Sequence, residues 1–287
     1  SDVCSSDLDP LNRTRYWEDP NFEGLGCLHA DFTAHNYAPH AHDGFVIAVT
    51  ETGGAEFTSR GKTGEALPAA LLVFNPNEPH SGRMGRSRHW RYRSLNLGPD
   101  AIRMLETMLD LPAPPHFAAN LFTDADLIRG FLDVHQALDA GTDPFRVREL
   151  LVGSFGALAR RHGIRRPDRL DAPRERARLG RVLQMMHDRP QAPLSLETLS
   201  EAADLSPFQL IALFKRVTGL TPHAYLVQLR LKAAMEGLRS GMAIADAATA
   251  AGFYDQSALT KHLKQCYGVT PLQFVRAREH TGRNFRQ

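Results

Sequence analysis

The chain has 287 residues, of which 43% are hydrophobic, enough for about two ordinary domains with buried cores. Its net charge of +2 is unevenly divided. Residues 171–287 hold 16 basic and 10 acidic residues (net +6), and residues 1–170 hold 18 basic and 22 acidic residues (net −4). The sequence contains no apolar run of roughly 18 to 20 residues, so we expect no membrane span. Three scattered cysteines argue against a disulfide framework and predict a cytoplasmic location.

Residues 1–8 (SDVCSSDL) lack an initiating Met and resemble the in-frame translation of a sequencing-adapter oligonucleotide. We expect this segment to be a non-native artefact and exclude it from the fold prediction. A cloning scar or a native tail is the alternative.

Residues 9–98 have the pattern of short β-strands. The run FVIAVT at 45–50 is apolar and β-branched, as in a buried strand. Gly53 and Gly54, and then the segment 61–64, are typical of hairpin turns. Strands at about ten-residue spacing predict a small all-β sandwich or barrel.

Residues 99–164 change to helical spacing, with helices expected over 101–109, 123–138 and 144–161. Asp124 and either Thr142 or Asp143 are expected N-caps, and Pro144 suits a first helical position. The third helix has an apolar stripe that can pack on the barrel, pair with a second subunit, or do both. The stripe consists of Val147, Leu150, Leu151, Phe155 and Leu158. Residues 165–174 are charged and contain proline, which predicts a linker.

The C-terminal part carries one pattern twice. LFKRVTGLTPHAY (213–225) and HLKQCYGVTPLQF (262–274) both end a helical run on Gly, an apolar residue and Thr-Pro. We predict an all-α domain over 175–283 with two helix-turn-helix units, at 195–218 and 243–267. An amphipathic helix over 223–238 would join them. Ser195, Ser206 and Asp255 are expected N-caps.

The second helix of each unit combines a buried stripe with a free face, the arrangement that enters a DNA major groove. In the second unit we expect Leu259, Leu263 and Tyr267 to be buried. Gln can pair with adenine, and Lys can reach guanine or a phosphate. A merely basic, solvated surface is the alternative. The predicted DNA-binding residues are Phe208, Gln209, Ile211, Ala212, Lys215 and Arg216 in the first unit, and Gln256, Ser257, Thr260, Lys261 and Lys264 in the second.

The segments LSPFQLIALFKRVTGLTPHAYLVQLRLKAA and IADAATAAGFYDQSALTKHLKQCYGVTPLQF resemble the DNA-binding domain of AraC/XylS-type bacterial transcription regulators. The resemblance implies that adjacent major grooves are read, with base-facing positions at Phe208, Ile211 and Ala212 and at Gln256, Ser257 and Lys261. The family often has Arg where this chain has Ala212, so we predict that the second unit carries most of the hydrogen-bonded specificity. The family usually has Gly where this chain has Asp204, but Asp tolerates positive φ.

The segments PHAHDG (39–44) and NPNEPH (75–80) resemble the cupin-like, effector-binding domain that often precedes the DNA-binding domain in this family. Metal-binding cupins use an HxH pair, a later His and an acid. The histidine positions match His40, His42 and His80, but Val46 stands where the acid is expected, with Glu78 or Glu51 as substitutes. The three imidazoles can hold zinc or another divalent ion, can bind an organic effector directly, or can be structural.

Trp90 and Tyr92 are two residues apart, so we expect them to share a strand face and to line an effector pocket together with these histidines. We expect His35 and His89 to lie at the surface.

The sequence therefore predicts a regulator that is not an enzyme. Its predicted partners are a double-stranded DNA operator, a small-molecule effector, a second copy of the chain and, for an activator, RNA polymerase. A metal-dependent cupin enzyme fused to a DNA reader is one alternative, and an effector-independent DNA-binding protein is another. The sequence contains no GxSxG, P-loop or dinucleotide fingerprint.

Overall fold

The computed structural model describes residues 12–164 and 173–283. The chain forms two compact units, one built mainly from residues 41–167 and the segment before 37, and the other mainly from residues 168–275. The predicted artefact at 1–8 and most of the predicted linker at 165–174 lie outside the described residues.

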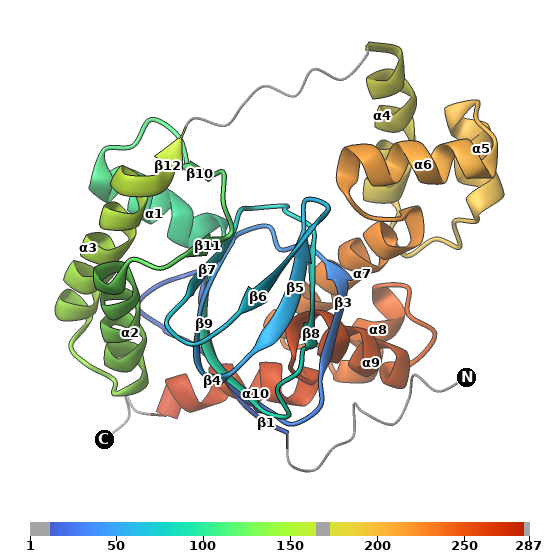
Figure 1. Ribbon diagram of the computed structural model, residues 1–287. Helices are drawn as coiled ribbons and strands as arrows, with labels where there is room; N and C mark the ends of the chain where they lie inside the picture. The colour runs from blue at the N-terminus through green and yellow to red at the C-terminus, as the bar shows by residue number, and fades with distance from the viewer. Residues whose placement is uncertain (1–11, 165–172, 284–287) are drawn as a thin grey trace. The chain divides into compact units, whose positions relative to one another are not determined.

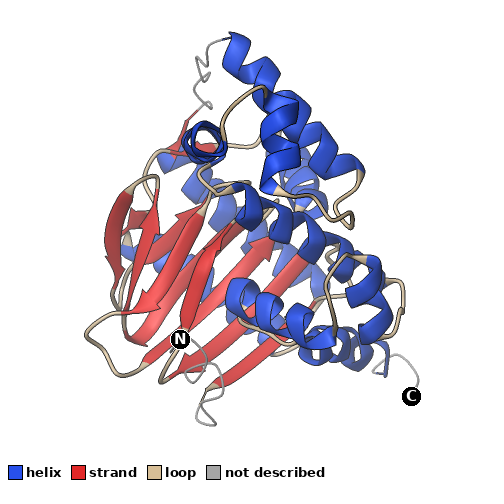
Figure 2. Cartoon of the chain, turned by 90° about the vertical axis from the view of Figure 1, so that its right-hand side faces the viewer, coloured by secondary structure: helices blue, strands red, loops and turns tan. Residues whose placement is uncertain are grey.

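The N-terminal region contains two large sheets and a short two-stranded one, and all strands are red in Figure 2. The larger is antiparallel, with six strands in the order β1-β2-β9-β4-β7-β11, and the smaller has the order β3-β8-β5-β6. They form the walls of the predicted cupin-like barrel (Figure 1). The main strands are β1 (Arg13–Glu18), β2 (Leu25–Phe32), β3 (Asn36–His40), β4 (Phe45–Gly53), β5 (Ala55–Ser59), β6 (Lys62–Ala66), β7 (Leu71–Phe74), β8 (His80–Met84) and β9 (Trp90–Leu97).

The apolar run FVIAVT forms β4, which lies between β9 and β7 in the larger sheet, so the prediction of a buried strand is confirmed. Successive side chains of a strand point to opposite faces. Phe45, Ile47 and Val49 belong to the core that the sheet shares with three helices, whereas Val46 and Ala48 pack in a second cluster with Phe74 and residues of the smaller sheet.

Helices α1 (Pro99–Leu109), α2 (Ala125–Asp139) and α3 (Pro144–His162) supply the other side of the larger core. In α3, Val147, Leu151 and Phe155 are buried there with Leu158. The apolar stripe of this helix therefore packs on the barrel, which was one of the two alternatives. Asp143 caps α3 by accepting hydrogen bonds from the amides of the two residues after Pro144.

Asp124 precedes α2 but makes no side-chain cap bond; its carboxylate pairs with Arg161 and His162 at the end of α3. Three two-residue strands also interrupt the region predicted to be helical: β10 (His116–Phe117), β11 (Leu121–Phe122) and β12 (Gly163–Ile164). β11 extends the larger sheet by pairing with β7. Strands this short carry no readable alternation, which is why the sequence did not predict them.

The described region from residue 173 onward is helical. Its helices are α4 (Pro173–Asp188), α5 (Leu196–Ala203), α6 (Pro207–Thr218), α7 (Pro222–Arg239), α8 (Ile244–Ala250), α9 (Gln256–Tyr267) and α10 (Pro271–Arg283). α5–α6 and α8–α9 are the two helix-turn-helix units, and α7 joins them, as predicted. In the first helix-turn-helix unit, Leu210 and Phe214 of α6 pack against Leu199 of α5. They also contact Val182 and Met186 of α4, in the same core.

The predicted helix starts of the second unit are confirmed. Ser195 accepts a hydrogen bond from the Thr198 amide, and Asp255 accepts one from Ala258. Ser206 and Gln209 form a complete capping box at the start of α6. Asp204 ends α5 in the left-handed region with φ 53°, so the turn forms without the usual glycine. Within the described residues, no helix is long and apolar enough to cross a membrane.

Candidate DNA-reading faces and effector site

The free face of α6 is largely apolar. The side chain of Phe208 is the most exposed large apolar group on it, at 81%, and Ala212 is exposed while Ile211 is half-buried. Gln209 is also exposed, but its Oε1 accepts the Ser206 amide at 3.0 Å. Lys215 and Arg216 lie exposed in the last turn, where Arg216 bonds Glu175 of α4 at 2.6 Å.

The free face of α9 is polar. Gln256, Ser257 and Lys261 are exposed, and Thr260 and Lys264 are half-buried. The Thr260 hydroxyl donates to the Gln256 carbonyl oxygen at 2.9 Å, four residues earlier in the helix. These side chains offer amide, hydroxyl and ammonium groups at the positions where α6 offers aromatic and aliphatic ones.

The opposite face of α9 is buried through Leu259, Leu263 and Cys266, whereas Tyr267 is only half-buried. The expectation for Tyr267 is therefore corrected, because Cys266 takes the third buried position. Burial raises the pKa of the Cys266 thiol to about 11, so it is a core group rather than a reactive one.

One exposed aromatic was not predicted as a DNA-binding candidate. Tyr254 lies in the turn directly before α9 and is 95% exposed. The sequence could have indicated this residue. Two aromatic residues stand side by side in the turn before the N-cap Asp255, and when Phe253 is buried its neighbour Tyr254 points outward.

The two helix-turn-helix units are joined by more than α7. The guanidinium of Arg230, in α7, donates to the carbonyl oxygens of Pro190 and Ala192 at 2.8 and 3.0 Å. Gly252, in the turn of the second unit, packs so closely on Gln191 that a Cβ there would lie 2.6 Å from the Gln191 Cα. The loop between α4 and α5 therefore contacts the turn of the second helix-turn-helix unit, between α8 and α9.

The interior of the barrel is aromatic on one wall. Trp90 and Tyr92 share a face of β9, are buried, and stack with ring centroids 4.3 Å apart. The Trp90 indole donates to the Thr50 hydroxyl at 3.2 Å. His35 is buried and stacks on Phe32 at 4.4 Å, so the expectation that it lies at the surface was wrong.

His89, in contrast, is half-exposed and pairs with Asp31. Each of these histidines directly precedes a strand, so the local pattern does not separate them. Phe32, which covers His35, lies only three residues before it, but Phe32 is itself buried beside Trp90 and Tyr92 of β9, so the burial of His35 depends on the pairing of distant strands.

The three predicted histidines come together. His40, His42 and His80 each offer a ligand nitrogen, and these atoms lie within 4.8 Å of one another. The rings of His42 and His80 stack at 5.4 Å, and the Phe74 ring stacks on His80 at 3.9 Å. Burial lowers the pKa of His42 to about 3 and that of His80 to about 4, so both rings are neutral at pH 7.

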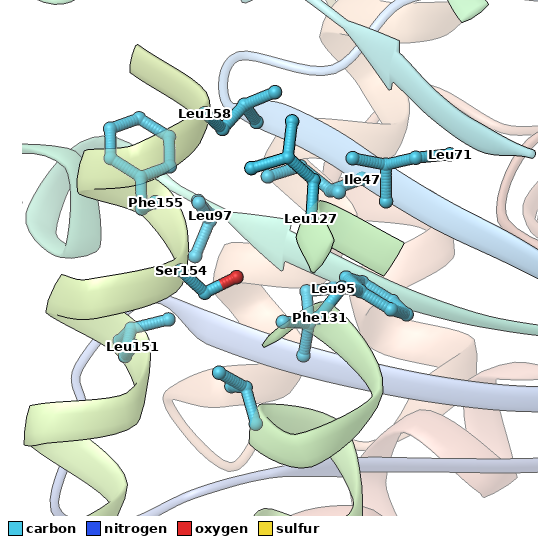
Figure 3. A pocket seen from close by; sticks show the side chains of 11 residues that line it. Ile47, Leu71, Leu95, Leu97, Leu127, Phe131, Leu151, Ser154, Phe155 and Leu158 are labelled. Atoms are coloured by element: carbon cyan, nitrogen blue, oxygen red, sulfur yellow. The ribbon is translucent and has the colours of Figure 1, made fainter. Parts of the chain in front are cut away.

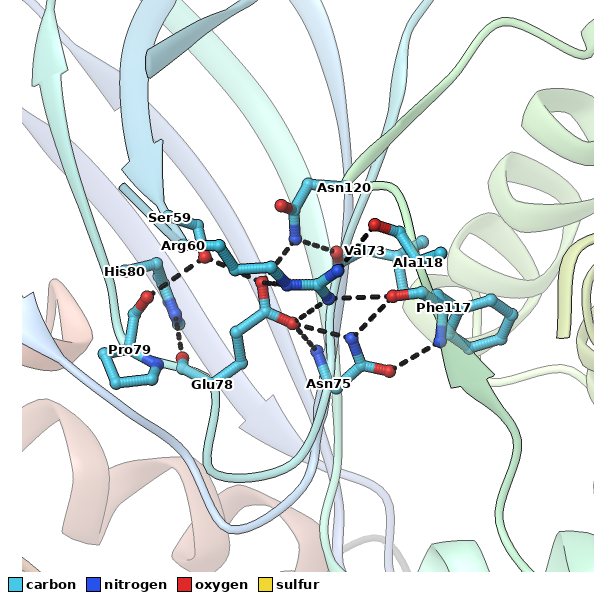
Figure 4. Close-up of polar contacts among 10 residues, drawn as sticks. All are labelled: Ser59, Arg60, Val73, Asn75, Glu78, Pro79, His80, Phe117, Ala118 and Asn120. Atoms are coloured by element: carbon cyan, nitrogen blue, oxygen red, sulfur yellow. Dashed lines mark hydrogen bonds and ion pairs between the residues drawn. The ribbon is translucent and has the colours of Figure 1, made fainter. Parts of the chain in front are cut away.

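The two acids offered as replacement ligands are engaged elsewhere, and this expectation is corrected. Burial opposes ionisation of Glu78, but hydrogen bonds from Arg60, Asn75, Ser59 and Asn120 lower its pKa to about 2 (Figure 4).

Glu51 binds Arg93 at 2.5 Å and His29 at 3.0 Å, on the face of β4 opposite to the barrel interior. Sequence spacing could not show either commitment, because every partner except Asn75 is distant along the chain.

A cavity lies on the far side of the larger sheet, between it and helices α2 and α3 (Figure 3). Its walls are apolar except for Ser154, and its volume of about 20 Å³ is that of a single water molecule. This cavity is too small for an organic effector.

Comparison with known proteins agrees with both halves of this description. Residues 24–153 match the family described as AraC-like ligand binding domain, and residues 199–277 match a helix-turn-helix domain family. The chain belongs to the AraC family of transcriptional regulators. It is therefore a DNA-binding regulator with an N-terminal ligand-binding domain.

Relatives support this assignment over different lengths. The chain is 26% identical over 220 residues to the uncharacterized HTH-type transcriptional regulator YbfI of Bacillus subtilis, covering 76% of this chain and 79% of YbfI. It is 30% identical over 148 residues to the regulatory protein Ada of Salmonella typhimurium, covering 51% of this chain but only 36% of Ada. The crystal structure of ToxT from Vibrio cholerae has the same fold, with a TM-score of 0.51 at 11% identity over 94% of this chain and 98% of ToxT.

Proposed function

We propose that this AraC-family regulator recognises its operator through α6 and α9, and that hydrogen-bonded base recognition is concentrated in α9. The observation that supports this is the chemical contrast between the two exposed faces. Gln256 and Lys261 can make directional hydrogen bonds with base edges, whereas Phe208 and Ala212 can only make apolar contacts, for example with thymine methyl groups.

The remaining polar candidates play a different part. Lys215 and Arg216 lie in the last turn of α6, and Arg216 already bonds Glu175, so we assign them to phosphate contacts rather than to base reading. Lys264 is half-buried near the end of α9 and is assigned in the same way. Such contacts position the protein on DNA without selecting a sequence.

The test begins by selecting an operator from random DNA and then compares Lys261→Ala with a matched control, Lys232→Ala, an exposed lysine of α7. We expect Lys261→Ala to weaken operator binding by about 1 to 3 kcal/mol, with a smaller loss on random DNA. Lys232→Ala should leave the ratio of the two affinities unchanged. An equal loss for Lys261→Ala on both DNAs would remove it as a base reader.

We further propose that the effector binds inside the barrel, against Trp90 and Tyr92. This interior combines a stacked aromatic wall with buried polar groups, as small-molecule sites do. The chain has two tryptophans, so a Trp17→Phe variant leaves Trp90 as the single indole reporter. Its fluorescence should respond to an effector that also changes operator affinity. An effector that shifts operator affinity while Trp90 emission stays constant would place the site elsewhere.

Three further predictions complete the proposal. The protein acts as a homodimer, and because the barrel occupies the stripe of α3, its subunits would meet through another surface, such as the one around Phe145, which is 72% exposed. It acts in the cytoplasm, where its DNA lies and where its buried free thiols Cys27 and Cys266 stay reduced. It works without catalysis, and an activator would also contact RNA polymerase.

A further inference from the structure

The loop between α4 and α5 meets both the middle of α7 and the turn between α8 and α9. We propose that Arg230 of α7 is a positioning residue. It fixes the angle between the reading helices α6 and α9, and thereby the spacing between the two DNA elements that the protein accepts. This role presupposes the proposed function, in which both helices read the operator. Arg230 acts without touching DNA, because its guanidinium is turned towards two carbonyl oxygens of the loop.

The joining helix α7 by itself fixes a distance better than an angle (Figure 1). Its 18 residues span about 27 Å at 1.5 Å per residue. Leu226, near its start, belongs to the core of the first helix-turn-helix unit, and Gly237, near its end, packs on Ala247 of α8. A tilt of about 10° about the middle of α7 would move a point about 13 Å away by about 2 Å, more than half of the roughly 3.4 Å between successive base pairs. Contacts away from the helix axis are therefore needed to hold α6 and α9 in register with the grooves.

Arg230 connects α7 to the first helix-turn-helix unit. Its Nε donates to the Pro190 carbonyl oxygen at 2.8 Å, and its Nη2 donates to the Ala192 carbonyl oxygen at 3.0 Å. The loop that offers these oxygens is stiff, because Pro190 and Pro193 have a fixed φ and the Ala192 amide donates to the Arg189 carbonyl oxygen at 3.1 Å. The helices on either side of the loop share one core with α6. Holding the loop therefore also holds α6.

The same side chain meets the second helix-turn-helix unit at Gly252, in the turn that leads into α9. A Cβ at Gly252 would lie 3.1 Å from Nε of Arg230 and 2.6 Å from Cα of Gln191. The φ of 89° at this position also suits glycine. Arg230, the loop and this turn thus form one junction, through which the orientations of α6 and α9 depend on each other.

The junction requires a guanidinium and not merely a positive charge. Two N–H groups of one planar fork reach two carbonyl oxygens, and a lysine ammonium, a single charged point on a flexible stem, does not reproduce that fork. Arg230→Lys keeps the net charge and therefore the long-range attraction to DNA phosphates. This substitution separates the geometric role of Arg230 from its charge.

The experiment measures binding of the full-length protein to the operator selected from random DNA. Two altered operators have one base pair inserted or removed between the segments whose footprint protection is lost in Phe208→Ala and in Lys261→Ala. We expect the wild type to lose affinity at least about tenfold on either change. Arg230→Lys should bind the selected operator about three- to tenfold more weakly but lose about threefold or less when the spacing changes, because loosely connected modules adapt to other separations. The control Lys232→Ala, an exposed residue of α7, should keep the wild-type loss.

Two contrary results have different meanings. If changed spacing costs Arg230→Lys as much affinity as it costs the wild type, within about twofold, Arg230 does not set the spacing, and reading by both helices is unaffected. If the wild type itself tolerates either change, the proposed use of both helices fails, and the role of Arg230 with it. Each comparison is a ratio between two DNAs for one protein preparation, so a variant that folds incompletely keeps the same ratio. Arg230→Gln is a second variant with the same expected tolerance of spacing.

Discussion

His135 gives the barrel a built-in sensitivity to mild acid. The ring is fully buried; Nε2 lies 3.2 Å from the Leu28 carbonyl oxygen, and Nδ1 lies 3.1 Å from the guanidinium of Arg93. The first contact requires a proton on Nε2, and the second requires a lone pair on Nδ1. Protonation of Nδ1 would set two donors against each other, so the folded protein needs the neutral ring.

The size of the effect follows from the pKa. Burial, and then the positive charge of Arg93, lower the pKa of His135 from 6.5 to about 4. The folded state therefore binds fewer protons than the unfolded state between these two values, and stability falls as the pH drops from 6.5 towards 4. A shift of this size corresponds to about 3 kcal/mol in total, of which about 2 kcal/mol is lost by pH 5.

The assay is urea unfolding followed by tryptophan fluorescence. Both tryptophans, Trp17 and Trp90, belong to the first unit, and the Trp17 ring contacts His135 edge-on at 5.2 Å, so the signal reports on this unit alone. The comparison is between wild type and His135→Gln, whose amide can donate to Leu28 and accept from Arg93 but does not titrate. A chelator is present throughout.

We expect His135→Gln to lose about 1 to 2 kcal/mol at pH 7.5, through imperfect packing, and to lose about 2 kcal/mol less than the wild type on going to pH 5. The control His223→Gln lies in the second unit and should follow the wild type at both pH values. Equal losses for wild type and His135→Gln between pH 7.5 and pH 5 would refute the assignment of this acid sensitivity to His135.

Three substitutions in the helix-turn-helix units test their turns and helix caps. Stability is measured by urea unfolding, followed by the circular dichroism signal of the helices. Gly252→Ala should destabilise by roughly 2 to 4 kcal/mol, because its φ of 89° suits glycine and the new Cβ would meet the Gln191 Cα at 2.6 Å; a neutral result would contradict the close packing. Asp204→Gly should stabilise by about 0.5 to 1 kcal/mol by relieving a φ of 53°, and a loss would mean that its exposed ion pair matters more than the backbone. Ser206→Ala should cost about 1 kcal/mol by removing the cap of α6, and an unchanged midpoint would show that the capping box is not needed.

Local signals were sufficient for most of the second unit. The Gly-x-Thr-Pro pattern marked where α6 and α9 end, and Ser206 and Asp255 marked where they begin. Helix caps and stripes arise from residues three or four apart, so they are written in consecutive letters. The same holds for the contrast between Phe208 and Lys261 on the two exposed faces.

For the barrel, the sequence predicted less and the fold decided more. An HxH pair and a later His could be recognised from their spacing, but only the packing of β3 beside β8 brings His40 close to His80. The sequence offered Glu78 and Glu51 as ligands, and the structure assigns both to arginines far along the chain.

By itself, then, the sequence determined the two-part architecture, the paired helix-turn-helix units and the residue types on each reading face. Tertiary structure alone decided that His35 is buried, that the stripe of α3 meets the barrel and that Glu78 holds a loop rather than an ion. The physical reason is the separation along the chain between the residues that interact. Caps, turns and periodicity depend on neighbours within a few residues, whereas the charge, burial and partners of a side chain depend on strands and helices that only folding brings together.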